Sequence, residues 1–155
     1  MASDSQFDYT EGNRHVWNVV SAKYAAELDD HVTALNAGRT TFLDYELNLL
    51  ANLESWCRRA VVLQCSHGQD ALSLWKLGVT DVIGIDFSAK MLALARRKSE
   101  QLGAPVTWIE ADTLKAPNEI NASADLVYTG KGSLPWIAAL DLWAEVVGRL
   151  LRPGG

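Results

Sequence analysis

The stretch that most constrains the fold is VVLQCSHGQDALSL, residues 61–74. Its first three residues form a short, β-branched-rich apolar run that predicts a buried strand. Gln64–Gln69 interrupt this run, and Gly68 is the residue there that adopts a positive φ without steric cost. From Asp70 onward, apolar residues recur with a helical period. A strand that enters a helix through a glycine turn is the first unit of a doubly wound α/β domain, whose ligands bind at the carboxyl ends of the strands.

Strand and helix patterns alternate along the rest of the chain. Strand-like apolar runs occupy Ala60–Leu63, Val82–Ile85, Val106–Ile109 and Asp125–Tyr128. Helical patterns occupy about Asp70–Leu77, Ser88–Leu102 and Ile137–Leu151, with glycine stops at Gly78 and Gly103. Such alternation predicts parallel strands joined by right-handed crossovers. We therefore expect an α/β fold with a doubly wound, mostly parallel sheet in the order 3-2-1-4, and a ligand crevice between strands one and four.

The residues before the first strand have a helical character. We expect residues 1 to about 12 to be unstructured or loosely docked. Asn13–Leu35, in one piece or two, and Thr40–Leu53 carry helical patterns. We expect residues 1–58 to form a helical layer that covers one edge of the sheet or acts as a lid. Residues 59–155 then form the α/β domain that binds the ligand, and the two parts make a single structural unit.

Composition and charge exclude several classes of protein. The chain has 155 residues, of which 48% are apolar and 21% charged, as in ordinary soluble globular domains. No apolar run approaches the roughly 20 residues of a membrane-spanning helix. The formal net charge of −5 argues against a nucleic-acid surface. Two cysteines, Cys57 and Cys65, indicate reduced thiols rather than a disulfide framework. We expect a cytoplasmic protein with no nucleic-acid or membrane partner.

Two groups of residues have ordinary structural interpretations. The basic run Arg96–Lys98 lies late in a predicted helix, where it complements the helix dipole, so we expect a solvated helix end. Trp108, Trp136 and Trp143 are expected to be packing residues, because core packing is the usual role of tryptophan.

Two acidic residues follow predicted strands and are candidate ligand contacts. Asp86 ends the second strand, about 20 residues after the glycine loop, where an acid in nucleotide-binding α/β domains accepts hydrogen bonds from ribose hydroxyls. Its alternative role is that of an acid favoured by the N-terminus of the next helix. Asp112 follows the third strand and has the position to accept a hydrogen bond from an adenine amino group. Its alternative role is that of a turn residue bonded to its own backbone.

Five segments, VVLQCSHG, VIGIDFS, VTWIEAD, ADLVYTG and RLLRPGG, follow one another between residues 60 and 155. Their order resembles that of class I S-adenosylmethionine-dependent methyltransferases, which have a Rossmann-like fold. The segment NRHVWNVVSAKY is similar to the N-terminal helix of members that act on small molecules. The resemblance implies S-adenosylmethionine as the cofactor and S-adenosylhomocysteine as the product.

The resemblance also assigns each segment a part of the cofactor. The implied cofactor-binding residues are Gln64, Cys65, Ser66, His67 and Gly68 for the methionine part, Asp86 for the ribose, Phe87 and Met91 beside the adenine, Asp112 and Thr113 at its edge, Tyr128 and Thr129 beneath the sulfonium and carboxylate, and Trp17 and Tyr24 from the N-terminal helix. No residue is assigned a catalytic role, and no metal is implied.

The glycine loop departs from the family pattern. Val62 stands where the family usually has an acid, and Gln64 and Ser66 stand at the first two of three alternating glycines. A positive φ at Gln64 or Ser66 would be strained, so we expect the loop backbone to follow a different path. We interpret the loop as a variant of the family site rather than a lost one.

Two loop residues have reactive side chains. His67 has three interpretations: it binds the cofactor carboxylate, acts as a base, or fills the loop. Loop filling is favoured, since the sequence offers no partner acid. Cys65 is expected to be a small buried residue rather than a nucleophile. The spacing of Cys57, Cys65 and the histidines does not fit a zinc site.

The family fold has seven strands, and the chain ends after the fourth. Two explanations are open: the chain is a truncated form of a longer enzyme, or a partner chain supplies the missing part of the sheet. The fourth strand would lie at an edge with unpaired backbone groups. We therefore predict a homodimer or swapped assembly through that edge.

The function favoured by the sequence is direct methyl transfer from S-adenosylmethionine to a small-molecule acceptor. The alternative is a catalytically inactive, methyltransferase-like module that binds the cofactor or a partner protein. A nicotinamide-dependent oxidoreductase fits Asp86 but not the single-glycine loop or the LLRPGG ending.

Overall fold

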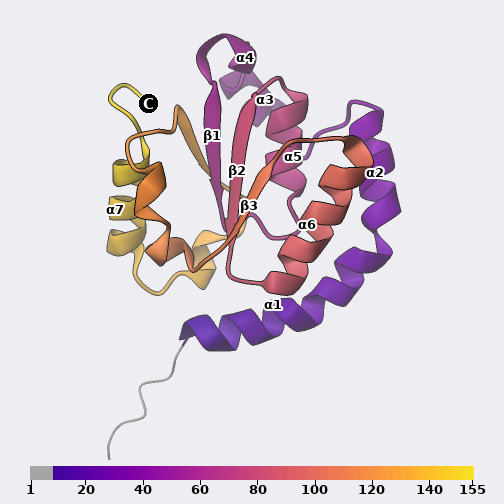
Figure 1. Ribbon diagram of the computed structural model, residues 1–155, viewed down its shortest axis with the longest axis horizontal. Coiled ribbons are helices and arrows are strands. Elements are labelled where there is room, and N and C mark those ends of the chain that lie inside the picture. The colour runs from indigo at the N-terminus through magenta and orange to yellow at the C-terminus, as the bar shows by residue number, and fades with distance from the viewer. Residues whose placement is uncertain (1–8) are drawn as a thin grey trace, which may run out of the picture.

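Four parallel strands form the centre of the fold (Figure 1). The computed structural model describes residues 9–155. Its strands are β1 (Arg59–Leu63), β2 (Asp81–Asp86), β3 (Thr107–Glu110) and β4 (Leu126–Thr129). Their order is β3-β2-β1-β4, and every pair is parallel. The predicted α/β fold and strand order are confirmed, and the strand bounds lie within about two residues of those expected from the apolar runs.

The register aligns the carboxyl ends of the strands. Leu63 of β1 pairs with Ile85 of β2 and with Thr129 of β4, and Asp86 pairs with Glu110. The loops that follow these four strands therefore leave the sheet at one common edge, which is where ligands bind in this class of fold.

Helices cover both faces of the sheet because consecutive strand residues point to opposite sides. Helices α5 (Gln69–Lys76) and α6 (Ala89–Leu102) cover one face, where Val62 packs with Leu74 and Leu92. Helix α7 (Leu140–Leu150) covers the other face and packs on Val61 and Leu63. Figure 1 shows α7 on one side of the strands and α5 and α6 on the other. The sheet is thus doubly wound, as predicted.

Helix ends follow local sequence signals where those signals are strong. Ser88 caps α6, and its hydroxyl accepts a hydrogen bond from the Met91 amide at 3.2 Å. Gly103 ends the same helix with a φ of 63°. Helix α7 begins at Leu140 rather than near residue 137, since Leu134–Trp136, with Pro135 in its first turn, forms a separate 3-10 turn, η3. Two further turns, η1 (Thr113–Lys115) and η2 (Asn118–Ile120), lie between β3 and β4.

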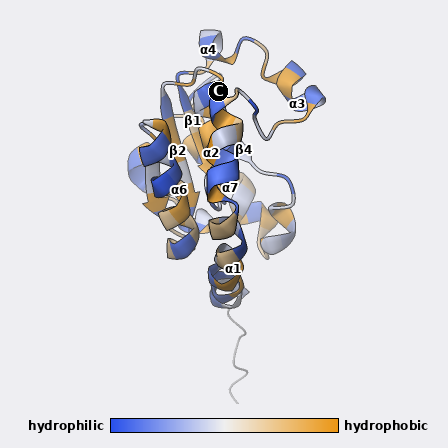
Figure 2. Ribbon diagram, turned by 90° about the vertical axis from the view of Figure 1, so that its right-hand side faces the viewer, coloured by the Kyte–Doolittle hydropathy of each residue, from blue (hydrophilic) through white to orange (hydrophobic). Residues whose placement is uncertain are grey.

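The N-terminal helices lie against α6 and across the carboxyl-end edge of the sheet (Figure 1). Helix α1 spans Tyr9–Ala26 and α2 spans Leu28–Asn36, so the expectation of irregular structure up to residue 12 is wrong for residues 9–12, and residues 1–8 lie outside the described part. Leu28 and Val32 are buried with Met91 of α6. In Figure 2, α1 and α7 mix hydrophilic and hydrophobic residues along their length, as expected for helices that bury one face.

The helix expected over Thr40–Leu53 does not form as one piece. Instead α3 spans Asp44–Leu49 and α4 spans Leu53–Trp56. The Thr41 amide and hydroxyl bond to side chains of α5, which keeps residues before Asp44 out of the helix. Asn52 has a φ of 53° and separates the two short helices.

None of the helices between residues 9 and 155 is both long enough and apolar enough to span a bilayer.

Candidate functional site

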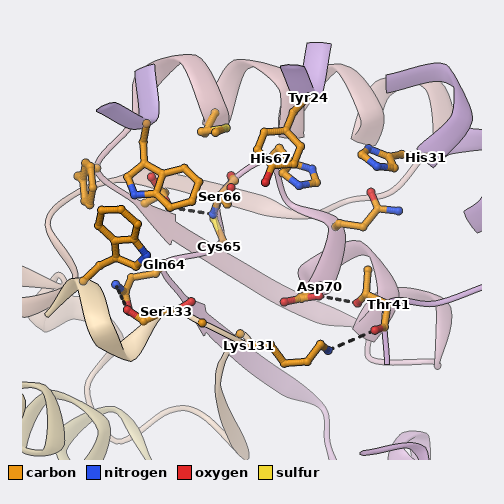
Figure 3. Close-up of a pocket in the computed structure, with 18 residues that line it drawn as sticks. Tyr24, His31, Thr41, Gln64, Cys65, Ser66, His67, Asp70, Lys131 and Ser133 are labelled. Carbon is orange, nitrogen blue, oxygen red and sulfur yellow. Dashed lines mark hydrogen bonds between the residues drawn. The ribbon is translucent and has the colours of Figure 1, made fainter. Parts of the chain in front are cut away.

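A cavity of about 380 Å³ lies at the carboxyl ends of the strands (Figure 3). This volume is within the range of small-molecule sites, roughly 300–1,000 Å³. Its walls come from the loop after β1 (Gln64, Cys65, Ser66, His67, Gln69, Asp70), from the end of β2 and the start of α6 (Asp86, Phe87, Met91), from the segment after β4 (Gly130, Lys131, Gly132, Ser133, Trp136) and from the N-terminal region (Trp17, Tyr24, His31, Thr41). Segments far apart in the sequence therefore meet at the edge that the strand order predicts.

Most of the predicted site residues line this cavity. Those that do are Trp17, Tyr24, Gln64, Cys65, Ser66, His67, Asp86, Phe87 and Met91. Gly68 lies behind the wall, and a Cβ there would come within 2.5 Å of the Trp108 ring and 2.7 Å of Ala95 Cβ. Asp112 and Thr113 line a smaller adjoining cavity of about 50 Å³, which shares Gln64, Phe87 and Trp136 with the larger one.

Two predicted residues at the end of β4 are not among those that line the large cavity. The Tyr128 hydroxyl donates to Glu46 Oε1 at 2.9 Å, and its ring packs edge-on against Phe42 at 5.4 Å. Burial raises the pKa of Tyr128 well above its ordinary value. The Thr129 hydroxyl is buried and has no hydrogen-bond partner among the described residues.

The loop after β1 keeps positive φ angles at alternating residues. The φ values are 52° at Gln64, 51° at Ser66 and 82° at Gly68. The expectation that the loop takes a different path because two glycines are missing is therefore wrong. Positive φ costs a non-glycine residue about 1–2 kcal/mol, and the surrounding contacts hold the conformation. The Cys65 amide donates to the Ile85 carbonyl at 2.9 Å, and the Gln64 side-chain amide donates to the Ser133 carbonyl at 3.2 Å.

Asp86 connects this loop to the start of α6. Its Oδ2 accepts from the Ser66 amide and its Oδ1 from the Ser88 amide, both at 2.8 Å. The side chain is buried, and desolvation raises its pKa although the backbone amides act in the opposite direction. A carboxylate oxygen has more than one acceptor site, so Asp86 supports the loop and can still accept a hydrogen bond from a ligand in the cavity that it lines.

Asp112 is a turn residue that bonds to nearby backbone, which is the alternative role expected from its position after the third strand. Its Oδ1 accepts from the Leu114 amide at 3.0 Å and caps η1. The Thr113 hydroxyl beside it is buried without a partner among the described residues.

Lys98 is fully buried, so the prediction of a solvated helix end is wrong at this residue. It follows Met91 by seven residues and Leu94 by four, which places it on the buried side of α6. Its Nζ lies 2.5 Å from His67 Nδ1, 3.1 Å from the His67 carbonyl and 3.2 Å from Gln69 Oε1. Desolvation lowers the pKa of Lys98 to about 7.

His67 forms the centre of an aromatic stack and does more than fill the loop (Figure 3). The Tyr24 ring lies 4.1 Å from the His67 ring at 22°, and the His31 ring lies 5.1 Å away at 13°. Desolvation, then Lys98 and His31, lower the pKa of His67 to about 3, so its ring is neutral at pH 7. Desolvation, followed by Lys98, also lowers the pKa of His31.

A polar network lies on another wall of the cavity. The Thr41 hydroxyl donates to Asp70 Oδ1 at 2.5 Å, and the Thr41 carbonyl accepts from Lys131 Nζ at 3.2 Å (Figure 3). Lys131 also pairs with Glu46 at 2.9 Å. Sequence reasoning did not assign these residues to the site. Lys131 carried a weak signal, because it lies in a glycine-rich segment after β4, but its partners lie far away in the sequence.

Helix α1 brings Trp17 to the cavity wall, where it meets Trp136 of η3. The Trp17 ring meets the Trp136 ring edge-on, with 5.3 Å between centroids. The Asn13 side chain donates to the Trp136 carbonyl at 3.1 Å, and Asn18 Oδ1 accepts from the Ser88 hydroxyl at 2.7 Å. Trp136 is 42% exposed, so the prediction that it packs in the core is wrong.

The other two tryptophans are packing residues as predicted. Trp108 packs against the core under α5 and α6 and donates to the Ser99 hydroxyl at 3.0 Å. Trp143 packs against the opposite core cluster.

The two cysteines are buried free thiols. Burial raises the pKa of Cys57 to about 11 and raises the pKa of Cys65 well above its usual range, so neither is a ready nucleophile. In residues 9–155, no group of three or more histidine, cysteine, aspartate or glutamate side chains has an arrangement that could hold a metal ion.

The sequence of this chain is similar to sequences of known proteins. The sequence model of a family described as "Methyltransferase domain" matches residues 60–155. A demethylmenaquinone methyltransferase from Thermus thermophilus is 36% identical over 94 residues, which make up 52% of this chain and 42% of that protein.

Solved structures share the fold. An S-adenosylmethionine-dependent methyltransferase from Mesorhizobium loti has a TM-score of 0.59 at 29% identity, over 72% of this chain and 48% of that one. Another from Thiobacillus denitrificans, solved in complex with S-adenosyl-L-homocysteine, has a TM-score of 0.58 at 20% identity, over 74% of this chain and 46% of that one. The chain thus spans less than half the length of each of these three proteins.

Proposed function

This chain belongs to the family of methyltransferase domains, and we propose that it transfers a methyl group from S-adenosylmethionine directly to a small molecule. The observation that carries the proposal is the cavity at the carboxyl ends of the strands. It combines a buried acid at the end of β2 with a positive-φ loop after β1 and several aromatic side chains. The methyltransferase of similar fold from Thiobacillus denitrificans was solved in complex with S-adenosyl-L-homocysteine, which supports a cofactor of this class.

The residues present fit such a cofactor. We assign Asp86 to the ribose hydroxyls, because its carboxylate lines the cavity and has acceptor capacity beyond its two backbone bonds. Phe87 and Met91 offer apolar surface beside it for the adenine ring. The adjoining small cavity extends from Phe87 to Asp112 and Thr113. The Thr113 hydroxyl has no hydrogen-bond partner within residues 9–155, which supports a role at the adenine edge.

The cofactor supplies a methyl group that its sulfonium already activates. The task of the protein is therefore alignment of the acceptor with that methyl group and exclusion of water. Trp17 and Tyr24 line the cavity with aromatic faces, which stabilise a nearby positive charge. A general base is needed only for acceptors that must lose a proton. We assign none, since the Nδ1 atom of His67 is already engaged by Lys98.

A small-molecule acceptor is supported by the demethylmenaquinone methyltransferase that shares 36% identity with part of the chain. The cavity is enclosed on the α1 side by Trp17 and Trp136, which suits a small ligand better than a polymer.

The alternative function is a cofactor-binding or interaction module without turnover. Gln64 and Ser66 at positive φ favour this alternative, because they place side chains where the family usually has glycine. A turnover assay with candidate acceptors separates the two functions, since only the enzyme forms S-adenosylhomocysteine.

Calorimetric titration of the 155-residue chain with S-adenosylmethionine and with S-adenosylhomocysteine tests the proposal first. We expect the chain to bind both compounds with dissociation constants in the micromolar range. A folded chain that binds neither would refute the cofactor site, and binding without turnover of any acceptor would favour the module.

A further inference from the structure

One wall of the cavity lies where the segment after α2 meets α5 and the chain after β4. Figure 3 shows Thr41, Asp70 and Lys131 together on this wall. The Thr41 hydroxyl donates to Asp70 Oδ1 at 2.5 Å, and the Thr41 carbonyl accepts from Lys131 Nζ at 3.2 Å. Glu46 accepts from Lys131 Nζ and from the Tyr128 hydroxyl, both at 2.9 Å. These bonds fix the wall through three separate segments of the chain.

The Asp70 carboxylate uses one of its two oxygens to hold this wall and leaves the other free. Its Oδ1 accepts from Thr41. Within residues 9–155, its Oδ2 has no hydrogen bond, and no lysine, arginine or histidine lies within ion-pair distance. Asp70 lines the cavity and is only partly buried. Because a carboxylate oxygen has two acceptor sites, Oδ2 can accept hydrogen bonds from a ligand.

Gly130 provides the space in which this free oxygen lies. A Cβ at residue 130 would come within 2.6 Å of Asp70 Oδ2 and 3.6 Å of Ser133 Oγ. The backbone of Gly130 does not have a positive φ, so it is the close approach of the carboxylate that requires glycine here. Gly130 and Ser133 line the same cavity. The chain after β4 is therefore shaped around the Asp70 carboxylate.

The charge of this wall favours a cationic ligand group. Of the cavity-lining residues between positions 9 and 155, Lys131 is the only lysine or arginine, and Glu46 neutralises it at 2.9 Å. Both oxygens of Asp86, by contrast with those of Asp70, already accept backbone amides. A protonated amino group would supply Asp70 with both an N–H donor and a positive charge. Such charge-assisted hydrogen bonds are roughly twice as strong as neutral ones.

We propose that Asp70 binds a protonated amino group of the methyl acceptor, so that the acceptor is a small amine. Asp70, Gly130 and Lys131 are not among the residues assigned to the cofactor, which leaves this wall for the second substrate. A protonated amino group has no lone pair, so in this form it anchors the acceptor and does not itself receive the methyl group. The inference rests on the proposed function, since it requires a methyl acceptor.

Three probes of similar size test the chemistry of the wall. Benzylamine, benzyl alcohol and benzoate carry a cationic, a neutral and an anionic group next to the same ring. Each is titrated into the chain saturated with S-adenosylhomocysteine, and binding is followed by NMR at the Gly130 amide. We expect benzylamine to bind about tenfold more tightly than benzyl alcohol, and benzoate to bind most weakly. Equal binding of benzylamine and benzyl alcohol, or preference for benzoate, would overturn the proposal.

Asp70→Asn tests whether the carboxylate produces the preference for the amine. Asparagine keeps an oxygen for the Thr41 hydroxyl, so the wall should stay in place. We expect the variant to lose the preference for benzylamine over benzyl alcohol and to bind S-adenosylhomocysteine within about twofold of the unaltered chain. Asp44→Asn is the matched control, because Asp44 is an exposed acid in the first turn of α3, and it should keep the preference.

Gly130→Ala tests the same carboxylate without changing its charge. The added methyl group would displace Asp70 Oδ2, so the preference for benzylamine should fall. Gly148→Ala is its control, since a Cβ at this residue of α7 meets no atom within 4 Å. A preference that persists in both Asp70→Asn and Gly130→Ala would show that another group binds the amine.

Binding of the nucleosides alone separates the remaining outcomes. If Asp70→Asn weakens S-adenosylhomocysteine about tenfold but not 5′-methylthioadenosine, which lacks the amino-acid part, Asp70 contacts the methyl donor and the proposal is overturned. If the unaltered chain binds neither nucleoside, the proposed function fails, and with it the assignment of this wall to a methyl acceptor.

Discussion

Single residues in the loop after β1 adopt a backbone conformation that their side chains disfavour. Ser66 has a φ of 51°, and its amide is held by Asp86 Oδ2 at 2.8 Å. Gln64 has a similar φ and is held through the Ser133 carbonyl. Strain of this kind persists only where neighbouring contacts over-determine the backbone, and it is concentrated at ligand sites.

Ser66→Gly should relieve part of that strain. We expect stabilisation of up to about 1 kcal/mol, since the gain from relieved φ strain exceeds the entropy that glycine adds to the unfolded chain. The free energy of unfolding in urea measures this change. The control is Ser133→Gly, where φ is −78° and glycine should only destabilise. A loss of stability in Ser66→Gly comparable to that of the control would contradict the strained loop.

Asp86→Ala should weaken S-adenosylhomocysteine binding by about 1–3 kcal/mol, because hydrogen bonds to a charged carboxylate are lost. It should also lower stability, since the Ser66 and Ser88 amides lose their acceptor. Calorimetry and urea unfolding measure the two effects. The control is Glu110→Ala, at the end of β3 and outside the cavity. Unchanged affinity in a folded Asp86→Ala protein would remove Asp86 from the site.

At the scale of elements, α5 connects the loop to the rest of the fold. Leu72 is fully buried and packs with Leu35 of α2 and with Ala104, while Leu74 packs on the sheet side with Val62. Helix α5 therefore lies between the N-terminal helices and the sheet. Its first turn carries Asp70, whose bond to Thr41 draws the chain after α2 to the cavity wall.

Leu72→Ala should destabilise the protein by about 2–5 kcal/mol, because truncation of a fully buried leucine leaves a cavity. The midpoint of urea unfolding measures the loss. Leu49→Ala is the matched control, since Leu49 is 78% exposed and its truncation should change stability by less than about 0.5 kcal/mol. Similar midpoints for both variants would show that α5 does not pack as described.

For the whole molecule, the buried Lys98–His67 pair makes stability depend on pH. Lys98 has a pKa of about 7 in the folded protein against an ordinary value of 10.5. Between these values Lys98 binds more protons in the unfolded chain than in the folded one, so it should make the free energy of unfolding rise with pH, by at most about 1.4 kcal/mol per pH unit. Above about pH 8.5 the buried thiols of Cys57 and Cys65, whose pKa values burial raises, act in the opposite direction, so the net rise is expected from about pH 7 to 8.5. His67, with a pKa of about 3 against 6.5, should lower stability as pH falls from about 6.5 to 3.

Urea unfolding from pH 3 to 10 measures both windows. Lys98→Met should lose the rise above pH 7, whereas Lys90→Met should keep it. An identical alkaline rise in all three proteins would mean that other groups produce it.

The outer edge of the sheet at β4 leads to a prediction about assembly. Within the described part of the chain, β4 pairs with β1 alone, so its outer backbone groups are open to another strand. We predict that the 155-residue chain forms a dimer through β4. Light scattering should give a mass that rises above 17.0 kDa with concentration. A mass of 17.0 kDa at every concentration would exclude the dimer.

The strand order and the location of the site follow from the sequence by itself. Short apolar runs, helical periods and glycine stops are local signals, and right-handed crossovers leave few arrangements of four parallel strands. Asp86 could be placed at the ligand edge because the end of a strand is a fixed position in such a sheet. Seven of the expected site residues follow β1 or end or follow β2, and they lie in the wall of the cavity. Trp17 and Tyr24, which the family resemblance implied, reach the wall from α1.

Tertiary structure alone decided how the side chains of the site meet. In the sequence, Lys98 is the last of three consecutive basic residues. Only the tertiary structure, in which it contacts His67 31 positions away, shows that it is buried. Thr41 meets Asp70 across 29 positions, and Trp136 meets Trp17. The loop kept its positive φ angles without two glycines because hydrogen bonds from β2 and from the segment after β4 hold it. Such long-range contacts cannot be predicted from local conformational propensity. Their combined free energy exceeds the local backbone preferences of the residues that they hold.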